Sequence, residues 1–197
     1  SHGSSDLTDN NTVGQASGKL GNAASFTQLN SEYLSVTNSD LDVGDEDWCY
    51  CLWLYITSFT GDAQMIASKI SGATQRSFQI QTRDPSYDIR FRVWDGSNVI
   101  GSVIHTTVLT TGQWYFVYFY HSATDNEIGI SIDAGESQTV ATTGAPIVVA
   151  NELKFGANPS GSHLDGRIDS VSHFQRLLSS SEISFLYNGG RGWEYPF

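Results

Sequence analysis

Several features that would assign a function directly are missing from this sequence. It has two cysteines and four prolines among 197 residues, and it contains 10 Lys and Arg against 21 Asp and Glu. Two cysteines supply neither a disulfide framework nor the spacing of a zinc site. The net charge of −11 argues against nonspecific binding to nucleic acid or to an anionic membrane, because both need a basic field on the protein.

The chain also shows no long hydrophobic run, no signal peptide, no Gly-rich phosphate loop and no nucleophile elbow. Cys49 and Cys51 lie two apart in an apparent strand, a geometry that strains a mutual disulfide, so we expect free thiols. Glu127 and Asp133 share a strand face but lie too far apart to serve as a glycosidase pair. We therefore expect no enzymatic activity.

The residues that are present favour short strands joined by tight turns. Aromatics make up 12% of the chain and there are 19 glycines, which is typical of an all-β sandwich of this length. We predict one domain over residues 1–197, with an N-terminal arm over 1–22. Ser179 and Glu182 have the spacing of a capping box, which predicts a short helix over 180–188.

The stretch Thr111–Asp133 predicts a long strand, a polar turn and a second strand. Side chains alternate along a strand, so one side of the first strand carries Trp114, Phe116, Tyr118 and Tyr120, and the other carries Tyr115, Val117, Phe119 and His121. We assign Tyr115, Val117 and Phe119 to the core between two sheets. The other aromatic side is either covered by neighbouring segments or open to a ligand.

Three further strands add to that outer surface. Trp48–Ile56 is apolar at nearly every position, and 77–83 and 88–94 alternate so that their arginines, glutamines and Trp94 point away from the core. We predict that these outward side chains share one sheet surface and bind a ligand. The predicted binding residues are Trp53, Tyr55, Gln79, Gln81, Arg83, Arg90, Arg92, Trp94, Phe116, Tyr118 and Tyr120.

Aromatic rings beside guanidinium and amide groups suit a sugar, and arginines in an acidic protein favour an anionic one. The alternative is that the arginines stack on rings simply to cover the sheet. A lyase would need a His or Tyr base beside Arg and Gln, an arrangement open to Gln81, Arg83 and Tyr118. We interpret His105, His121 and His173 instead as hydrogen-bonded structural residues.

The end of the chain carries a specific pattern, Gly166-x-Ile168-Asp169-x-Val171 followed by Arg176-x-Leu178-Ser179-x-x-Glu182-Ile183-x-x-Leu186-Tyr187-Asn188. Supporting residues are Ala24-x-Phe26, Tyr33-Leu34-x-Val36, Trp53, Ser68-Lys69 and Thr111-Gly112-Gln113-Trp114. Together they resemble the laminin-G-like, concanavalin-A-like jelly-roll family over nearly the whole chain. The resemblance implies two antiparallel sheets, one convex and one concave, with ligands on the concave face or its rim. In that family the closing strand often has an aliphatic residue where His173 stands.

The same resemblance implies a structural calcium, because the family's aspartate at the position of Asp169 often helps to hold one. Carboxylate and carbonyl oxygens suit this hard cation. The alternatives are that Asp169 hydrogen-bonds the N-terminal arm or pairs with Arg167 or Arg176. The acidic loop Asp40–Asp47 is a weaker calcium candidate.

This family's fold serves lectins, carbohydrate-binding modules, adhesion domains, virion surface proteins and some glycosidases and lyases, so it does not decide the function. Our leading hypothesis is a non-catalytic glycan-binding or adhesion domain, extracellular or on a virion surface, with a glycan or glycoprotein as partner. The alternative is a structural domain that uses the aromatic face for assembly on a virion or cell surface. A polysaccharide lyase ranks third. We expect neither nucleic-acid binding nor membrane insertion.

Overall fold

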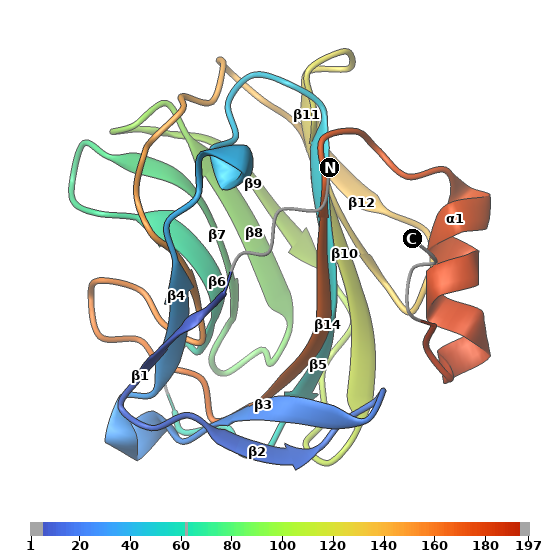
Figure 1. The fold of residues 1–197 in the computed structure, drawn as a ribbon. Helices are drawn as coiled ribbons and strands as arrows, with labels where there is room; N and C mark the ends of the chain where they lie inside the picture. The colour runs from blue at the N-terminus through green and yellow to red at the C-terminus, as the bar shows by residue number, and fades with distance from the viewer. Residues whose placement is uncertain (1–5, 62, 194–197) are drawn as a thin grey trace.

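The computed structural model describes residues 6–61 and 63–193. Two seven-stranded antiparallel sheets pack face to face, and one short helix lies outside them (Figure 1). This arrangement confirms the predicted two-sheet sandwich with a C-terminal helix.

Sheet 1 contains, in spatial order, β1 (Thr8–Asn10), β4 (Tyr33–Val36), β13 (Leu153–Phe155), β6 (Met65–Ile70), β7 (Arg76–Thr82), β8 (Ile89–Trp94) and β9 (Val99–His105). Sheet 2 contains β12 (Gln138–Ala141), β11 (Glu127–Ile132), β10 (Trp114–Ser122), β5 (Trp48–Ile56), β14 (Gly166–Phe174), β3 (Asn22–Phe26) and β2 (Gly14–Ser17). The helices are η1 (Gln28–Asn30), η2 (Ser39–Leu41), α1 (Ser180–Tyr187) and η3 (Asn188–Gly190). Many spatial neighbours are distant in sequence, so the chain crosses repeatedly between the two sheets.

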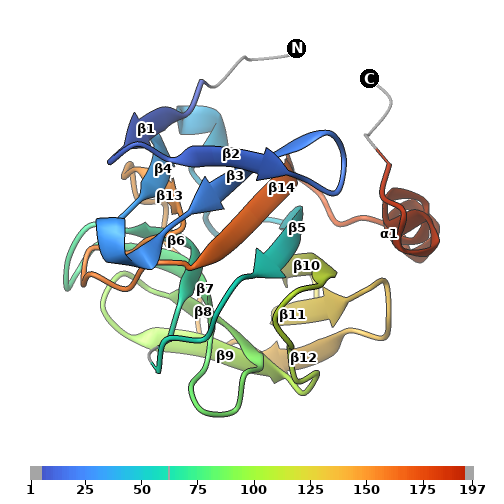
Figure 2. The same cartoon turned by 90° about the horizontal axis from the view of Figure 1, so that it is seen from below.

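The N-terminal arm is more regular than its sequence indicates. It forms β1, which pairs with β4 at the edge of sheet 1, and β2, which pairs with β3 at the edge of sheet 2. Figure 2 shows β2 and β3 side by side at that edge. The arm therefore extends both sheets.

The core lies between the sheets, where alternate residues of each strand meet. Tyr115, Val117 and Phe119 of β10 are buried there, as predicted, and the Phe119 ring packs on Phe78 and Phe91 of sheet 1. The sequences of β7 and β8 alternate regularly because their apolar side chains face this core and their polar side chains face outward.

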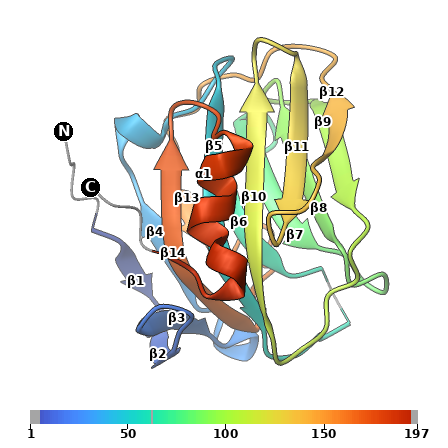
Figure 3. The same cartoon turned by 90° about the vertical axis from the view of Figure 1, so that its right-hand side faces the viewer.

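Sheet 2 is covered on its outer side as well. Helix α1 begins at a capping box in which Ser179 and Glu182 exchange hydrogen bonds, as the sequence predicts. The helix lies over the outer face of sheet 2 between β14 and β10 (Figure 3), and Leu186 is buried against the outward aromatic rings. A strand buried on both sides explains why β10 is aromatic on both of its faces. No helix in the described part of the chain is long and apolar enough to cross a membrane.

Candidate functional site

The predicted binding residues do not share one surface. Trp53 and Tyr55 lie on β5, and Phe116, Tyr118 and Tyr120 lie on β10, so these five belong to sheet 2. The glutamines, the arginines and Trp94 lie on β7, on β8 or just beyond β7, in sheet 1. The expectation of one shared face is therefore wrong. Alternation predicts on which face of a sheet a side chain lies, but it does not predict to which of the two sheets the strand belongs.

The sheet 2 half of the predicted set lies under α1 and the segment that precedes it. Trp53, Phe116 and Tyr118 are each only 2% exposed. The Trp53 ring stacks on Tyr187 with centroids 5.9 Å apart, and the backbone N–H of Leu178 donates to Tyr118 Oη at 3.3 Å. Burial raises the pKa of Tyr118. These rings form a second core, in which Tyr118 does not meet Gln81 and Arg83 as a lyase site would require.

The other two aromatic residues of this half are also engaged within the domain. Tyr120 Oη donates to Glu127 Oε1 at 2.8 Å. The Arg167 guanidinium lies over the Tyr55 ring at 4.8 Å from its centroid. The geometry therefore supports the interpretation that the protein itself covers the rings of this face.

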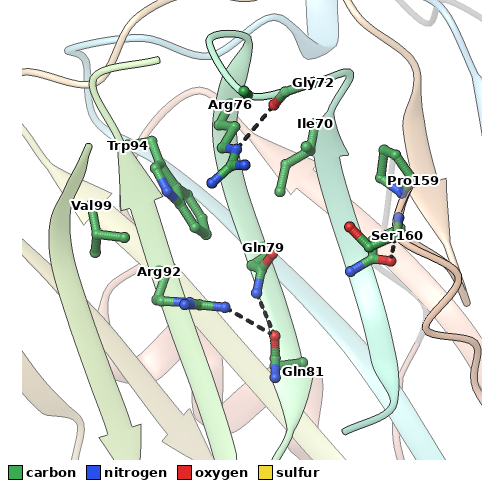
Figure 4. Close-up of a pocket in the computed structure, with 12 residues that line it drawn as sticks. Ile70, Gly72, Arg76, Gln79, Gln81, Arg92, Trp94, Val99, Pro159 and Ser160 are labelled. Carbon is green, nitrogen blue, oxygen red and sulfur yellow. Dashed lines mark hydrogen bonds between the residues drawn. The ribbon is translucent and has the colours of Figure 1, made fainter. Parts of the chain in front are cut away.

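Part of the sheet 1 half lines a cavity of about 490 Å³ on the outer face of β7 and β8 (Figure 4). Four predicted residues, Gln79, Gln81, Arg92 and Trp94, lie in it. The remaining lining comes from β6, the turn after it, the start of β7 and β9, and the loop between β13 and β14: Ile70, Gly72, Ala73, Arg76, Val99, Asn158, Pro159 and Ser160.

A chain of hydrogen bonds orders the floor of this pocket. Gln81 Oε1 accepts from Gln79 Nε2 and from Arg92 Nη2, the latter at 3.2 Å. Arg76 Nε donates to the Gly72 carbonyl at 3.0 Å and so is held at the turn between β6 and β7.

Several buried donors on this face have no acceptor among the described residues. Arg90 Nε, Arg92 Nε and Trp94 Nε1 are buried and have no hydrogen-bond partner among them. Buried donors without partners are rare, because each costs about 1–3 kcal/mol of desolvation. The arrangement suits a ligand rich in acceptor oxygens.

The electrostatics of the pocket favour an anion. Burial, with the like charges of Arg90 and Arg76, lowers the pKa of Arg92 to about 10. Burial and then the charge of Arg83 lower the pKa of Arg90. None of the twelve residues that line the cavity carries a carboxylate, although the whole chain has a net charge of −11.

Arg83 and Arg90 do not line the cavity. Arg83 Nε and Nη2 donate to the two carboxylate oxygens of Asp88 at 2.6 and 2.7 Å, so this guanidinium is neutralised at the turn between β7 and β8. Arg90 lies opposite Gln81 across the two strands.

Arg76 lines the pocket although the alternation of the sequence does not place it there. In strict alternation, Arg76 falls on the same side as the core residue Phe78. The register between β6 and β7 shifts between Lys69 and Ile70, which turns Arg76 to the outer face. The loop residues Asn158 to Ser160 come from a distant part of the chain and carry no local signal.

A second hollow of about 580 Å³ lies at the end of the sandwich and includes Ser58, His163 and Asp165. These residues do not form a catalytic relay. Ser58 Oγ donates directly to Asp165 Oδ2, and the His163 Nδ1 atom lies 2.9 Å from the Gly161 carbonyl.

Asp169 contacts the N-terminal arm. Its Oδ2 accepts from the backbone N–H groups of Lys19 at 2.7 Å and Leu20 at 2.8 Å, and its Oδ1 accepts from Ser170 Oγ at 3.2 Å. These donors do not fit a cation, and no three His, Cys, Asp or Glu side chains gather around a metal position anywhere in the described residues. The structure therefore shows the first alternative to a calcium ligand, in which Asp169 is hydrogen-bonded to the N-terminal arm. The calcium site itself stays a prediction.

The acidic loop likewise contacts protein groups. Asp42 pairs with the buried Lys69 at 2.7 Å, and Asp47 Oδ1 accepts from the backbone of Ala123 at 2.9 Å. Cys49 and Cys51 are free and buried, as predicted, and burial raises the pKa of each thiol to about 12.

Two of the three histidines interpreted as structural have the expected hydrogen bonds. His105 Nδ1 accepts from the Thr107 backbone at 3.3 Å, and His121 Nδ1 lies 2.8 Å from the Glu46 carbonyl. His173 stacks on Tyr50 with ring centroids 4.5 Å apart, and its Nε2 has no hydrogen-bond partner among the described residues.

These features define a jelly-roll sandwich with a hollowed outer face on one sheet and a helix covering the other. A sequence profile described as the concanavalin A-like lectin/glucanases superfamily matches residues 28–184. The chain therefore belongs to this superfamily. No curated protein sequence matches it.

Several solved structures share the fold at low identity. The binding domain of Paraclostridial Mosquitocidal Protein 1 has a TM-score of 0.78 and 14% identity over 94% of this chain and 48% of that one. Domain 4 of AbnA, an extracellular arabinanase from Geobacillus stearothermophilus in complex with arabinotriose, has a TM-score of 0.68 and 17% identity over 95% of this chain and 87% of that one.

The ligand-binding domain of botulinum neurotoxin serotype D in complex with N-acetylneuraminic acid has a TM-score of 0.62 and 18% identity over 80% of this chain and 40% of that one. The chain thus spans about half the length of the mosquitocidal structure and less of the neurotoxin structure. At these identities the likeness shows the fold.

Proposed function

We propose that this domain is a non-catalytic carbohydrate-binding module whose ligand is an acidic glycan held in the pocket on sheet 1. The observation that carries the proposal is the lining of that pocket. It offers guanidinium, amide and indole donors and no carboxylate among the described lining residues, in a chain of net charge −11. Saccharides supply many acceptor oxygens, and acidic ones add a charged group that arginine binds strongly.

The relatives support a binding role over a catalytic one. Two are binding domains of toxins, and one is a domain of an extracellular arabinanase; two of these structures hold N-acetylneuraminic acid or arabinotriose. We extend this to the present chain as a domain that works outside the cell or on a surface and whose partner is a glycan or glycoprotein.

A glycan array that includes acidic polysaccharides tests the proposal directly. We expect the wild type to bind acidic glycans and Arg76→Ala to weaken that binding at least tenfold, because a charged hydrogen bond contributes about 1.5–3 kcal/mol. The matched control is Arg191→Ala, which removes the same charge from an exposed position after α1. Absence of binding to any glycan, or equal losses in the two variants, would contradict the proposal.

The second candidate is a structural domain that decorates a virion or cell-surface assembly. The observation in its favour is a pair of exposed rings, Phe185 on α1 and Trp193, whose centroids lie 5.7 Å apart. The aromatic side of β10 does not support it, since α1 already covers that side. A wild-type protein that binds no glycan on the array would leave this candidate as the better one.

A further inference from the structure

Trp94 lines the pocket on sheet 1, yet its side chain is only 2% exposed. The Arg92 guanidinium lies over its ring, with Cζ 5.1 Å from the ring centroid. Both side chains point to the same side of β8 in Figure 4, where Arg92 extends toward Gln81. In this arrangement the arginine occupies the position that the apolar face of a sugar takes when it stacks on an indole.

Arg92 is held in this position by few interactions. Its Nη2 donates to Gln81 Oε1 at 3.2 Å, and its Nε has no hydrogen-bond partner within the described chain. No carboxylate among the described lining residues neutralises it, in contrast to Arg83, which has two short bonds to Asp88. An anionic oxygen would give Arg92 a shorter and stronger charge-assisted bond than the amide of Gln81 provides.

We propose that Arg92 is the residue that determines the specificity of this pocket, because it covers Trp94 until an anionic group of the glycan draws its guanidinium away. This inference rests on the proposed carbohydrate-binding function. An acidic saccharide forms an ion pair with Arg92 and then stacks on the freed indole. A neutral saccharide of the same backbone has no group that compensates for moving the arginine, and so it does not reach the ring.

The covering of Trp94 is tested without any ligand, by acrylamide quenching of tryptophan fluorescence. Arg92→Ala is expected to raise the quenchable fraction, and adding Trp94→Phe to that variant is expected to remove the increase. The matched control is Arg167→Ala, which removes a guanidinium that lies over a ring on sheet 2. Equal quenching of wild type and Arg92→Ala would overturn the inference.

The selectivity is tested by calorimetric titration with two matched pairs of probes: oligogalacturonate against its methyl ester, and sulfated dextran oligosaccharide against plain dextran oligosaccharide. We expect the wild type to prefer at least one acidic probe over its neutral partner by tenfold or more. The pair that shows the preference distinguishes a carboxylate from a sulfate ester as the anionic group.

Arg92→Ala should lose most of the acidic preference, keeping only the part that Arg76 supplies, and should bind the neutral probe several-fold more tightly than the wild type, whereas Arg167→Ala should behave as the wild type. A wild type that binds acidic and neutral probes equally would overturn the inference and the acidic character of the proposed ligand, and would leave carbohydrate binding itself standing. A wild type that binds none of the four probes and no glycan on the array would overturn both. An equal loss of affinity of Arg92→Ala for both members of a pair would overturn the inference, because Arg92 would then contact the glycan without determining the specificity.

Discussion

The assignment of the aromatic side of sheet 2 to a second core can be tested at Leu186. This α1 side chain is 3% exposed and packs on the rings of β5 and β10, whereas its neighbour Phe185 is 48% exposed. We expect Leu186→Ala to lower the free energy of unfolding far more than Phe185→Ala.

The magnitude follows from burial and from the cavity that is left. Complete burial of a leucine contributes about 1.5–3 kcal/mol, and truncations of buried leucine to alanine cost about 2–5 kcal/mol once the cavity is included. Helix α1 has eight residues and lies at the surface, so it can settle toward the sheet, and we expect about 2–3 kcal/mol. Phe185→Ala should cost about 0.5 kcal/mol or less.

Guanidinium denaturation of both variants, followed by circular dichroism in the far and near ultraviolet, measures the difference. For a chain of this size about 2–3 kcal/mol corresponds to a fall in Tm of about 4–12 °C. A near-ultraviolet change without a far-ultraviolet change would indicate that α1 has left the rings while the sandwich remains folded. Losses of about 0.5 kcal/mol in both variants would refute the second core and reopen that face as a ligand surface.

Two further predictions concern buried polar groups. Asp169→Ala should lower the free energy of unfolding by about 1–3 kcal/mol, because two backbone N–H groups of the arm lose their acceptor. If the predicted calcium is present, a chelator lowers the Tm of the wild type and not that of the variant. An unchanged wild-type melting curve would contradict the calcium prediction. Burial, with the charge of Lys69, lowers the pKa of His173 from 6.5 to about 4. Between those pH values the unfolded chain therefore binds a proton that the folded chain does not. The free energy of unfolding should fall as the pH is lowered through this range, by up to about 1.4 kcal/mol per pH unit. His173→Leu should make this fall shallower in urea titrations from pH 7 to pH 4, and parallel curves for the two proteins would show that His173 does not titrate as the burial indicates.

Local alternation predicted most of what the strands do. The core sides of β7 and β8 are as expected, since a polar residue between two apolar ones is a signal carried by three consecutive residues. The closing strand and its capped helix were also predictable, because Ser179 and Glu182 satisfy each other within one turn.

The partition of the outward residues between two sheets could not be predicted in this way. It depends on pairings such as β5 with β10 and with β14, which join segments far apart in the chain. The role of α1 as a cover was missed for the same reason, since its contact with the rings of β5 and β10 also joins segments far apart in the chain. The turning of Arg76 depends on a register shift that leaves no pattern in β7 itself.

The two outer faces of the sandwich differ in how much sequence change they can absorb. On sheet 2 each outward ring contacts α1 or a neighbouring ring, so a substitution there has to be matched by others. On sheet 1 the positions 76, 79, 81 and 92 line a cavity of about 490 Å³, which leaves space on one side for a different side chain, although Gln79 and Gln81 are themselves only 5% and 6% exposed. Randomising those four positions should yield a library that keeps its fold while its ligands change, which makes this domain a natural scaffold for new binding proteins.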